Sequence, residues 1–234
     1  MALPPARPIA TLRAVVLAVA LGPAALAAQT SAVIDEGSFT ITLQGAPYGR
    51  ESFRIVRTPA PGGQVFRATG QGALGDNRVT SILGTDSTGI PVSYSSDLSL
   101  NGRVVQRLQG RGRPGRFSIL SSTTAGEAAR EYVLDAGALL IDGDIMHHYF
   151  FVPLSAHSML SVIAPRTGQQ ISFQVTEVGR EQLEIAGRAI DSRHFSLAGS
   201  TGIRRDVWVD AQGRLLKVVM PDRGLAAVRD DPPR

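Results

Sequence analysis

The chain has 234 residues, no cysteine and a formal net charge of +4. The absence of cysteine excludes disulfide bonds, thiol catalysis, zinc–thiolate sites and a bacterial lipid anchor on an N-terminal cysteine. The small net charge does not indicate binding to nucleic acid or to a membrane surface. No cofactor motif is present, so none is expected.

Residues 1–27 have the pattern of a secretory signal peptide. Two arginines precede an apolar run from Ala14 to Leu21, and small residues lead to an A-x-A exit at Ala25 and Ala27. The run is too short for a membrane helix, which needs about 20 residues. We therefore predict cleavage after Ala27, a periplasmic or secreted protein, and no transmembrane segment in the mature chain. Loss of the two arginines leaves a net charge of +2.

Apolar and polar residues alternate strictly in several stretches after the signal peptide. Phe39 and Ile41 share one face of such a stretch, and Ile171, Phe173 and Val175 share a face of another. This alternation indicates strands with one buried face, which are usually antiparallel. We predict one all-β domain with minor helix over residues 28–234, with about a dozen strands. They would form one large curved antiparallel sheet, a half-barrel or nearly closed barrel, with one short helix.

Turn residues separate the alternating stretches. Asn101-Gly102 lies between two of them and predicts a tight hairpin, because both positions of a type I′ turn need positive φ. Residues 45–49 and Asp210–Gly213 are predicted to connect further strands.

The segment Asp144–Ser158 breaks the alternation. Its apolar residues recur at helical spacing and Pro153 lies inside it. We predict a short helix or helical turn that ends near Phe151, because proline disfavours helix for the residue before it. It would pack against the concave side of the sheet. An irregular strand is the alternative.

Three histidines are the first candidates for metal binding or catalysis: His147, His148 and His157. Neighbouring residues point about 100° apart on a helix and to opposite faces on a strand, so adjacent histidines suit one metal poorly. The H-E-x-x-H motif is absent. We therefore expect no metal site. The favoured interpretation is a pair of histidines at a sheet edge, with one ring half-buried beside Tyr149.

No hydrolase motif accompanies these histidines. The G-x-S-x-G motif does not occur, and a serine–histidine–aspartate triad is recognised by geometry rather than by sequence. Neither Asp135 nor Asp142 has the hydroxyl residue that an aspartic protease places between aspartate and glycine. Paired carboxylates for glycoside hydrolysis are not indicated either. An enzyme is therefore the least favoured class.

Two further features suggest a ligand or a partner. Arg103, Arg107 and Arg111 share parity, so a regular strand would project them from one face toward an anionic group. The alternative is a solvated face that discourages aggregation. Trp208 faces away from its neighbours Val207 and Val209. It belongs either to a ligand-facing side or to a core covered on both faces of a folded-over sheet.

The C-terminal part resembles uncharacterised, signal-bearing bacterial envelope families. The residues that carry the resemblance are Ile203–Lys217, with Val-Trp-Val-Asp and a D-x-x-G-R-L-x-K hairpin, and a final strand at Leu225–Arg229. Met146–Phe150 and Ile163–Gly168 look similar to the middle of such families. The resemblance implies an envelope compartment and an open half-barrel similar to periplasmic lipoprotein carriers. It implies no catalytic residue.

The leading hypothesis is a non-enzymatic periplasmic protein that binds an apolar or amphiphilic molecule, such as a lipid, in the concave face of the sheet. Phe39, Phe53, Phe173 and Trp208 are candidate wall residues, and the three arginines of the basic strand are candidates for an anionic head group. The alternative is a structural or assembly protein that docks on another envelope component. A nucleic-acid partner is not expected.

Overall fold

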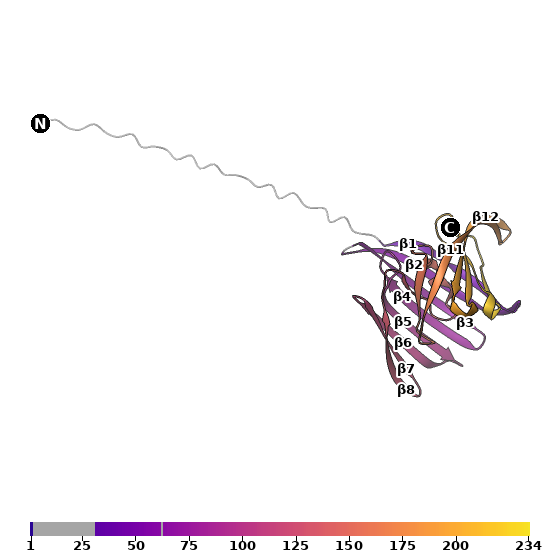
Figure 1. The fold of residues 1–234 in the computed structure, drawn as a ribbon, viewed down its shortest axis with the longest axis horizontal. Coiled ribbons are helices and arrows are strands. Elements are labelled where there is room, and N and C mark those ends of the chain that lie inside the picture. Colours follow the sequence, from indigo (N-terminus) through magenta and orange to yellow (C-terminus); the bar gives the residue numbers. More distant parts are fainter. Residues whose placement is uncertain (2–30, 62) are drawn as a thin grey trace.

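The computed structural model describes residue 1, residues 31–61 and residues 63–234 (Figure 1). Residues 2–27 of the predicted signal peptide, and its cleavage site, lie outside the described residues. The described part is almost entirely β. Its strands are β1 (Ala32–Leu43), β2 (Ala46–Ala60), β3 (Gly63–Leu74), β4 (Asn77–Thr85), β5 (Pro91–Leu100), β6 (Arg103–Arg113), β7 (Arg116–Thr123), β8 (Gly126–Val133), β9 (Ala138–Leu140), β10 (Met159–Ala164), β11 (Gln169–Ile185), β12 (Arg188–Gly199), β13 (Arg204–Val209), β14 (Leu215–Met220) and β15 (Leu225–Arg229).

Three short 3-10 helices complete the described elements: η1 (Met146–Phe151), η2 (Ser200–Gly202) and η3 (Pro221–Arg223). In this part of the chain, no helix has both the length and the apolar character that a membrane crossing requires.

All 15 strands form one sheet, in the order β8-β7-β6-β5-β4-β3-β2-β1-β15-β14-β13-β12-β11-β10-β9. β8 and β9 are therefore the two edges, and they follow each other in the sequence, which brings the edges together. A side chain of β11 contacts the β8 edge across the gap: Gln170 accepts from the Val133 N–H at 3.2 Å and donates to the Val133 carbonyl oxygen at 2.8 Å. The sheet is a nearly closed barrel, as the sequence predicts. Every pairing is antiparallel except β9 with β10, which is parallel.

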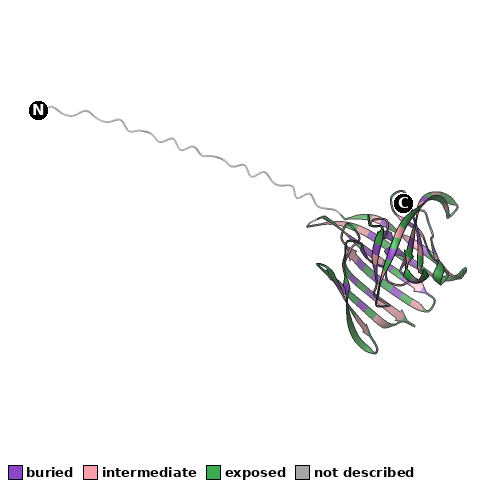
Figure 2. Ribbon diagram, in the orientation of Figure 1, coloured by how far each residue is buried: buried purple, intermediate pink, exposed green. Residues whose placement is uncertain are grey.

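Burial alternates along the strands, as the purple and green bands of Figure 2 show. Phe39 and Ile41 of β1 face the interior with no exposed surface, and Phe53 and Ile55 of β2 lie beside them. The Phe39 and Phe53 rings stack at 5.0 Å. One face of the sheet thus forms the barrel core, which confirms the strand assignment.

The predicted turns are confirmed with one shift of position. Asn101 and Gly102 both have positive φ, at 50° and 75°, as a type I′ turn requires. The first hairpin turns at Gln44-Gly45, and β2 already starts at Ala46, so residues 46–49 belong to a strand. The prediction that Pro47 belongs to the turn is therefore wrong. A proline can occupy a position near the start of a strand, and Pro47 is the second residue of β2.

The element η1 confirms the predicted helical turn and its end at Phe151. All six of its residues are buried. The Phe66 ring of β3 packs edge-on against the rings of Phe150 and Phe151, with centroid distances of 6.1 and 6.0 Å. The turn therefore lies on the concave side of the sheet and fills the middle of the barrel.

A second, smaller core lies on the other face of the sheet and contains Trp208, Ile185 and Leu216. The β11–β12 hairpin has a register shift between Glu177 and Gly179, and such a bulge bends a strand. The Trp208 ring stacks on the His194 ring at 4.2 Å. Trp208 thus belongs to a core on the face away from the barrel interior, the second of the two interpretations given above.

Candidate functional site

Glu51 holds η1 inside the barrel. Its carboxylate accepts hydrogen bonds from the backbone N–H groups of Met146 and His147, at 2.8 and 2.9 Å, and pairs with His147 Nδ1 at 2.8 Å. Glu51 is 1% exposed and the His147 side chain is fully buried. The first N–H groups of a helical turn have no partner within the turn, and Glu51 supplies one. A carboxyl group so deeply buried is tolerated because its oxygens accept bonds from these donors.

A second buried network surrounds Asp142. The Tyr94 hydroxyl donates to it at 2.5 Å, and Arg166 donates both its backbone N–H, at 3.0 Å, and its Nη2, at 2.8 Å. Burial and the adjacent carboxylate raise the pKa of Tyr94 well above 10.0, so this hydroxyl stays protonated. Both oxygens of Asp142 are occupied, and the carboxylate anchors the floor segment, residues 141–149, to β5.

His148 lies between the two networks. Its Nδ1 accepts a hydrogen bond from the Asp142 N–H at 3.2 Å, so the proton resides on Nε2. Within the described residues, Nε2 is buried without a hydrogen-bond partner. Burial lowers the pKa of His148 well below 6.5, and the neighbouring His147 and Arg166 act in the same direction. The histidine is therefore neutral in the folded protein.

Stability should fall at acidic pH because of His148. The unfolded chain takes up a proton below about pH 6.5 and the folded chain does not, so the free energy of unfolding decreases by about 1.4 kcal/mol per pH unit below that point. A His148→Asn variant keeps an acceptor for the Asp142 N–H and should lose this slope. Urea unfolding between pH 7 and pH 5 measures it. His157→Asn is the control, because His157 is exposed; equal slopes in all three proteins would contradict the assignment.

His147 lies between a serine and a glutamate in the order of a catalytic triad. Its Nε2 lies 3.5 Å from the Ser81 hydroxyl, and its Nδ1 faces Glu51. All three side chains are buried, and Ser81 lines a hollow on the sheet that is separate from the cavity described below. No group of three or more metal-binding side chains occurs in the described ranges. We therefore assign the Glu51–His147 pair a role in holding the floor.

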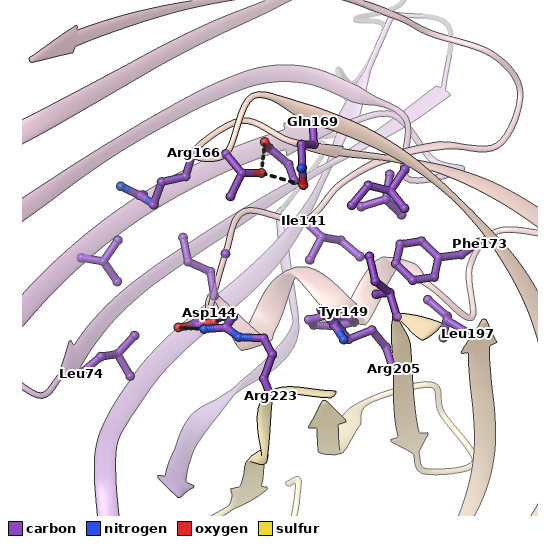
Figure 3. Close-up of a pocket in the computed structure, with 18 of the residues that line it drawn as sticks. Leu74, Ile141, Asp144, Tyr149, Arg166, Gln169, Phe173, Leu197, Arg205 and Arg223 are labelled. Carbon is purple, nitrogen blue, oxygen red and sulfur yellow. Dashed lines mark hydrogen bonds and ion pairs between the residues drawn. The ribbon is translucent and has the colours of Figure 1, made fainter. Parts of the chain in front are cut away.

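Above this floor, η1 leaves part of the barrel empty. A cavity of about 450 Å³, here called the cup, lies between the floor segment and one end of the barrel (Figure 3). The facing ends of β3 and β4 and residues from the β10–β11 and β12–β13 connections line it at that end. Its wall is mainly apolar, with Leu74, Val79, Leu98, Ile171, Phe173 and Leu197 among the lining residues.

Charged groups enter the cup at a few points. Arg166, Arg205 and Arg223 line it together with a single carboxylate, that of Asp144. Arg223 is bonded to Asp144, and Arg205 lies beside Tyr149 (Figure 3). The Arg223 side chain is 41% exposed, so the cup reaches solvent on this side.

The residues singled out from the sequence lie in several places. Phe173 lines the cup, whereas Phe39 and Phe53 pack in the barrel core and Trp208 lies in the outer one. The expectation of two edge histidines, one half-buried, is wrong for His147 and His148, which are both fully buried in the interior. Only His157 is exposed.

The three arginines predicted to share one face of β6 do not all do so. β6 has a register shift against β5 between Gln106 and Val104, and this irregularity separates Arg103 from Arg107 and breaks the alternation. All three arginines are exposed, and none of them lines the cup. Arg107 donates two hydrogen bonds to Asp97, at 2.8 and 3.1 Å. The pairing of β6 is regular from Arg107 to Arg111, so these two arginines share the exposed face.

Sequence reasoning missed Glu51, Ser81, Arg205 and Arg223. For three of them, the alternation of the strand indicates that the side chain points inward. Glu51 shares the parity of Phe53, Ser81 that of Leu83 and Arg205 that of Val207, so each is a polar residue at an inward position. Arg223 follows a strand and has no such signal.

The chain has partial matches to known proteins. A family profile described as "Domain of unknown function (DUF6134)" matches residues 117–229. The matched part runs from β7 to the end of β15 and includes the floor segment and the three arginines of the cup, but it excludes Glu51. This match agrees with the resemblance of the C-terminal part to uncharacterised families. No curated protein matches the chain.

A solved structure also shows similarity: the crystal structure of a beta-barrel-like protein of domain of unknown function DUF1849 from Brucella abortus. It is 9% identical and has a TM-score of 0.46, with 86% of this chain and 98% of that chain covered.

Proposed function

We propose that this chain is an exported, non-enzymatic protein that binds an apolar or amphiphilic molecule in the cup. The observation that carries the proposal is a cavity of about 450 Å³ with mainly apolar walls. Ligand sites commonly occupy about 300–1,000 Å³ and combine apolar walls with a few polar groups that orient the ligand. The cup has both properties.

The two polar networks support a structural role for the buried titratable groups. Glu51 and Asp142 hold the floor segment to β2 and β5, and their bonds are directed to backbone and side-chain donors of the chain itself. A rigid floor keeps the cavity open, because η1 cannot move up to fill it. A preformed cavity lowers the cost of ordering the site when a ligand binds.

Export is part of the proposal and is supported by the composition of residues 1–27. A periplasmic or extracellular protein that holds an apolar molecule keeps it from water outside the cytoplasm. The proposed ligands are therefore lipids or other amphiphiles of that compartment.

Binding of a neutral fluorescent hydrophobe, N-phenylnaphthylamine, tests the proposal. The full-length chain is produced in a Gram-negative bacterium and purified from the periplasmic extract, where native mass spectrometry should show a chain that starts at Ala28. The probe should brighten on titration. Ala164→Phe, on the cup wall, should weaken its binding by about tenfold, or about 1.4 kcal/mol.

Ala189→Phe is the matched control, because Ala189 is exposed on β12 and does not line the cup. It should bind the probe like the unsubstituted chain. Absence of probe binding, or equal weakening by both substitutions, would overturn the proposal.

A further inference from the structure

We infer that the cup selects amphiphiles with an acidic head group, which Arg205, Arg223 and Tyr149 bind in exchange for the carboxylate of Asp144. This inference rests on the proposed function and adds the chemical class of the ligand. It depends on three observations: how the polar groups converge, which carboxylates lie behind them, and which one faces the cavity.

Two guanidinium groups and one hydroxyl converge on the same part of the wall. Tyr149 comes from η1, Arg205 from β13 and Arg223 from η3. Arg205 lies beside Tyr149 in Figure 3, and both Arg205 and Arg223 act against the rise that burial causes in the pKa of Tyr149. Three elements far apart in the sequence thus present donors to one point of the cup.

The Tyr149 hydroxyl keeps its proton at neutral pH. Burial raises the pKa of Tyr149 to about 12, although Arg205 opposes the effect. A hydroxyl that accepts from a guanidinium still has its own proton to donate. An oxyanion is the ligand group that accepts from both a hydroxyl and a guanidinium, and bonds to charged acceptors are stronger than neutral ones.

Arg205 has donors that Asp222 and the Arg204 carbonyl oxygen do not use. A guanidinium carries five N–H donors in a planar fork. The bonds of Arg205 to Asp222 and to the backbone carbonyl oxygen of Arg204 both leave from Nη1. Neither bond uses Nε or Nη2, so these atoms are available to a ligand oxygen.

The carboxylates near the cup are not equivalent. Asp142 is fully buried and held by Tyr94 and Arg166, and Asp222 pairs with Arg205 from outside the lining. Among the carboxylates of the described ranges, that of Asp144 alone lines the cup, where it bonds to both terminal nitrogens of Arg223. An incoming acid would therefore compete with Asp144 and not with the other two.

The same charges disfavour a cationic head group. Each guanidinium is paired with a carboxylate, but the carboxylates paired with Arg166 and Arg205 are not part of the lining, so an ammonium group would meet these two guanidiniums at closer range than their counter-charges. Like charges brought together out of water weaken binding, and selectivity commonly uses such repulsion. We therefore expect the affinity of the cup to be highest for an acid, lower for a neutral alcohol and lowest for an amine.

Amphiphiles that share one twelve-carbon tail test the order directly: dodecanoate, dodecyl phosphate, dodecanol and dodecylammonium. Each displaces N-phenylnaphthylamine from the purified full-length chain, and the displacement gives its dissociation constant. At least one acid should bind about tenfold more tightly than dodecanol, as expected for one added charge-assisted hydrogen bond. The tighter of the two acids identifies the head group as carboxylate or phosphate.

Two substitutions assign the residues. Arg205→Gln should reduce the ratio of acid to dodecanol affinity toward one, and urea unfolding checks that the variant is folded. Asp144→Asn should raise the affinity for the acid about threefold or more, because it removes the competing charge while the amide still bonds to Arg223. A contact that serves only structure would leave acid binding unchanged or weaker in Asp144→Asn, which would overturn its assigned role.

The possible results separate the two proposals. Equal affinity for dodecanoate, dodecyl phosphate and dodecanol would overturn the inference and leave the proposed function intact. Failure of all four compounds and of the probe to bind would overturn both. Tighter binding of dodecylammonium than of either acid would overturn the inference alone.

Discussion

A Gly70→Ala variant is expected to lose about 3 kcal/mol of stability, because overpacking of a filled core commonly costs about 1–3 kcal/mol or more. A Cβ atom at this position would lie 2.3 Å from Cε1 and 2.6 Å from Nδ1 of the His147 ring. The ring has little freedom to move, because Nδ1 is bonded to Glu51. Chemical denaturation monitored by circular dichroism measures the loss.

Gly84→Ala is the matched control for Gly70→Ala. Gly84 lies in the adjacent strand β4, and its added Cβ would meet only the hydroxyl of Ser93, at 2.5 Å, which can turn away. Alanine also costs less backbone entropy than glycine in a strand. Gly84→Ala should therefore remain within about 0.5 kcal/mol of the original stability. A loss as large at Gly84 as at Gly70 would contradict the explanation based on His147.

A Glu51→Ala variant is expected to lose about 3–5 kcal/mol, because each buried donor left without its acceptor costs about 1–3 kcal/mol. The substitution leaves two backbone N–H groups and one imidazole nitrogen buried without the acceptor they had. Glu51→Gln keeps one carbonyl oxygen and should lose less. Urea unfolding of the two variants at neutral pH measures both effects.

Glu184→Ala is the control for Glu51→Ala, because Glu184 is exposed on β11. It should change stability by less than about 0.5 kcal/mol. Because Glu51 holds the floor of the cup, Glu51→Gln should also weaken binding of the neutral probe. Full stability of Glu51→Ala would show that the buried pair is not what fixes η1.

The local features of the fold were predictable because they depend on neighbouring residues. The alternation around Phe39 and Ile41 indicates a strand with one buried face whatever it pairs with. Asn101-Gly102 specifies its turn through the positive φ that both residues accept. The helical turn that ends near Phe151 follows from Pro153 two positions later.

The buried networks were not predictable, because they join residues far apart in the chain. Glu51 and His147 are separated by 96 positions and meet only through the curvature of the sheet. The parity of Glu51 with Phe53 indicates an inward carboxylate but not its partner. Gly70 has no sequence signal at all, since its importance comes from the ring packed against it.

The cup illustrates the same division between local and distant information. Because Arg205 has the same parity as Val207, its side chain is expected on the inner face. Its distance from Tyr149, however, depends on the position of η1 inside the barrel. For β6, the prediction made from sequence parity is wrong. A register shift between Arg103 and Arg107 places their side chains on different faces, although their spacing in the sequence is even.

By itself, the sequence determined the all-β class, the period of the strands, several turns and the helical turn between them, because side-chain alternation and backbone preference act over a few residues. The tertiary structure alone decided that both adjacent histidines are buried, that Glu51 clamps the floor, and that a cavity with one carboxylate and three guanidiniums remains above it. These depend on strand register and barrel closure, which bring distant residues within bonding distance.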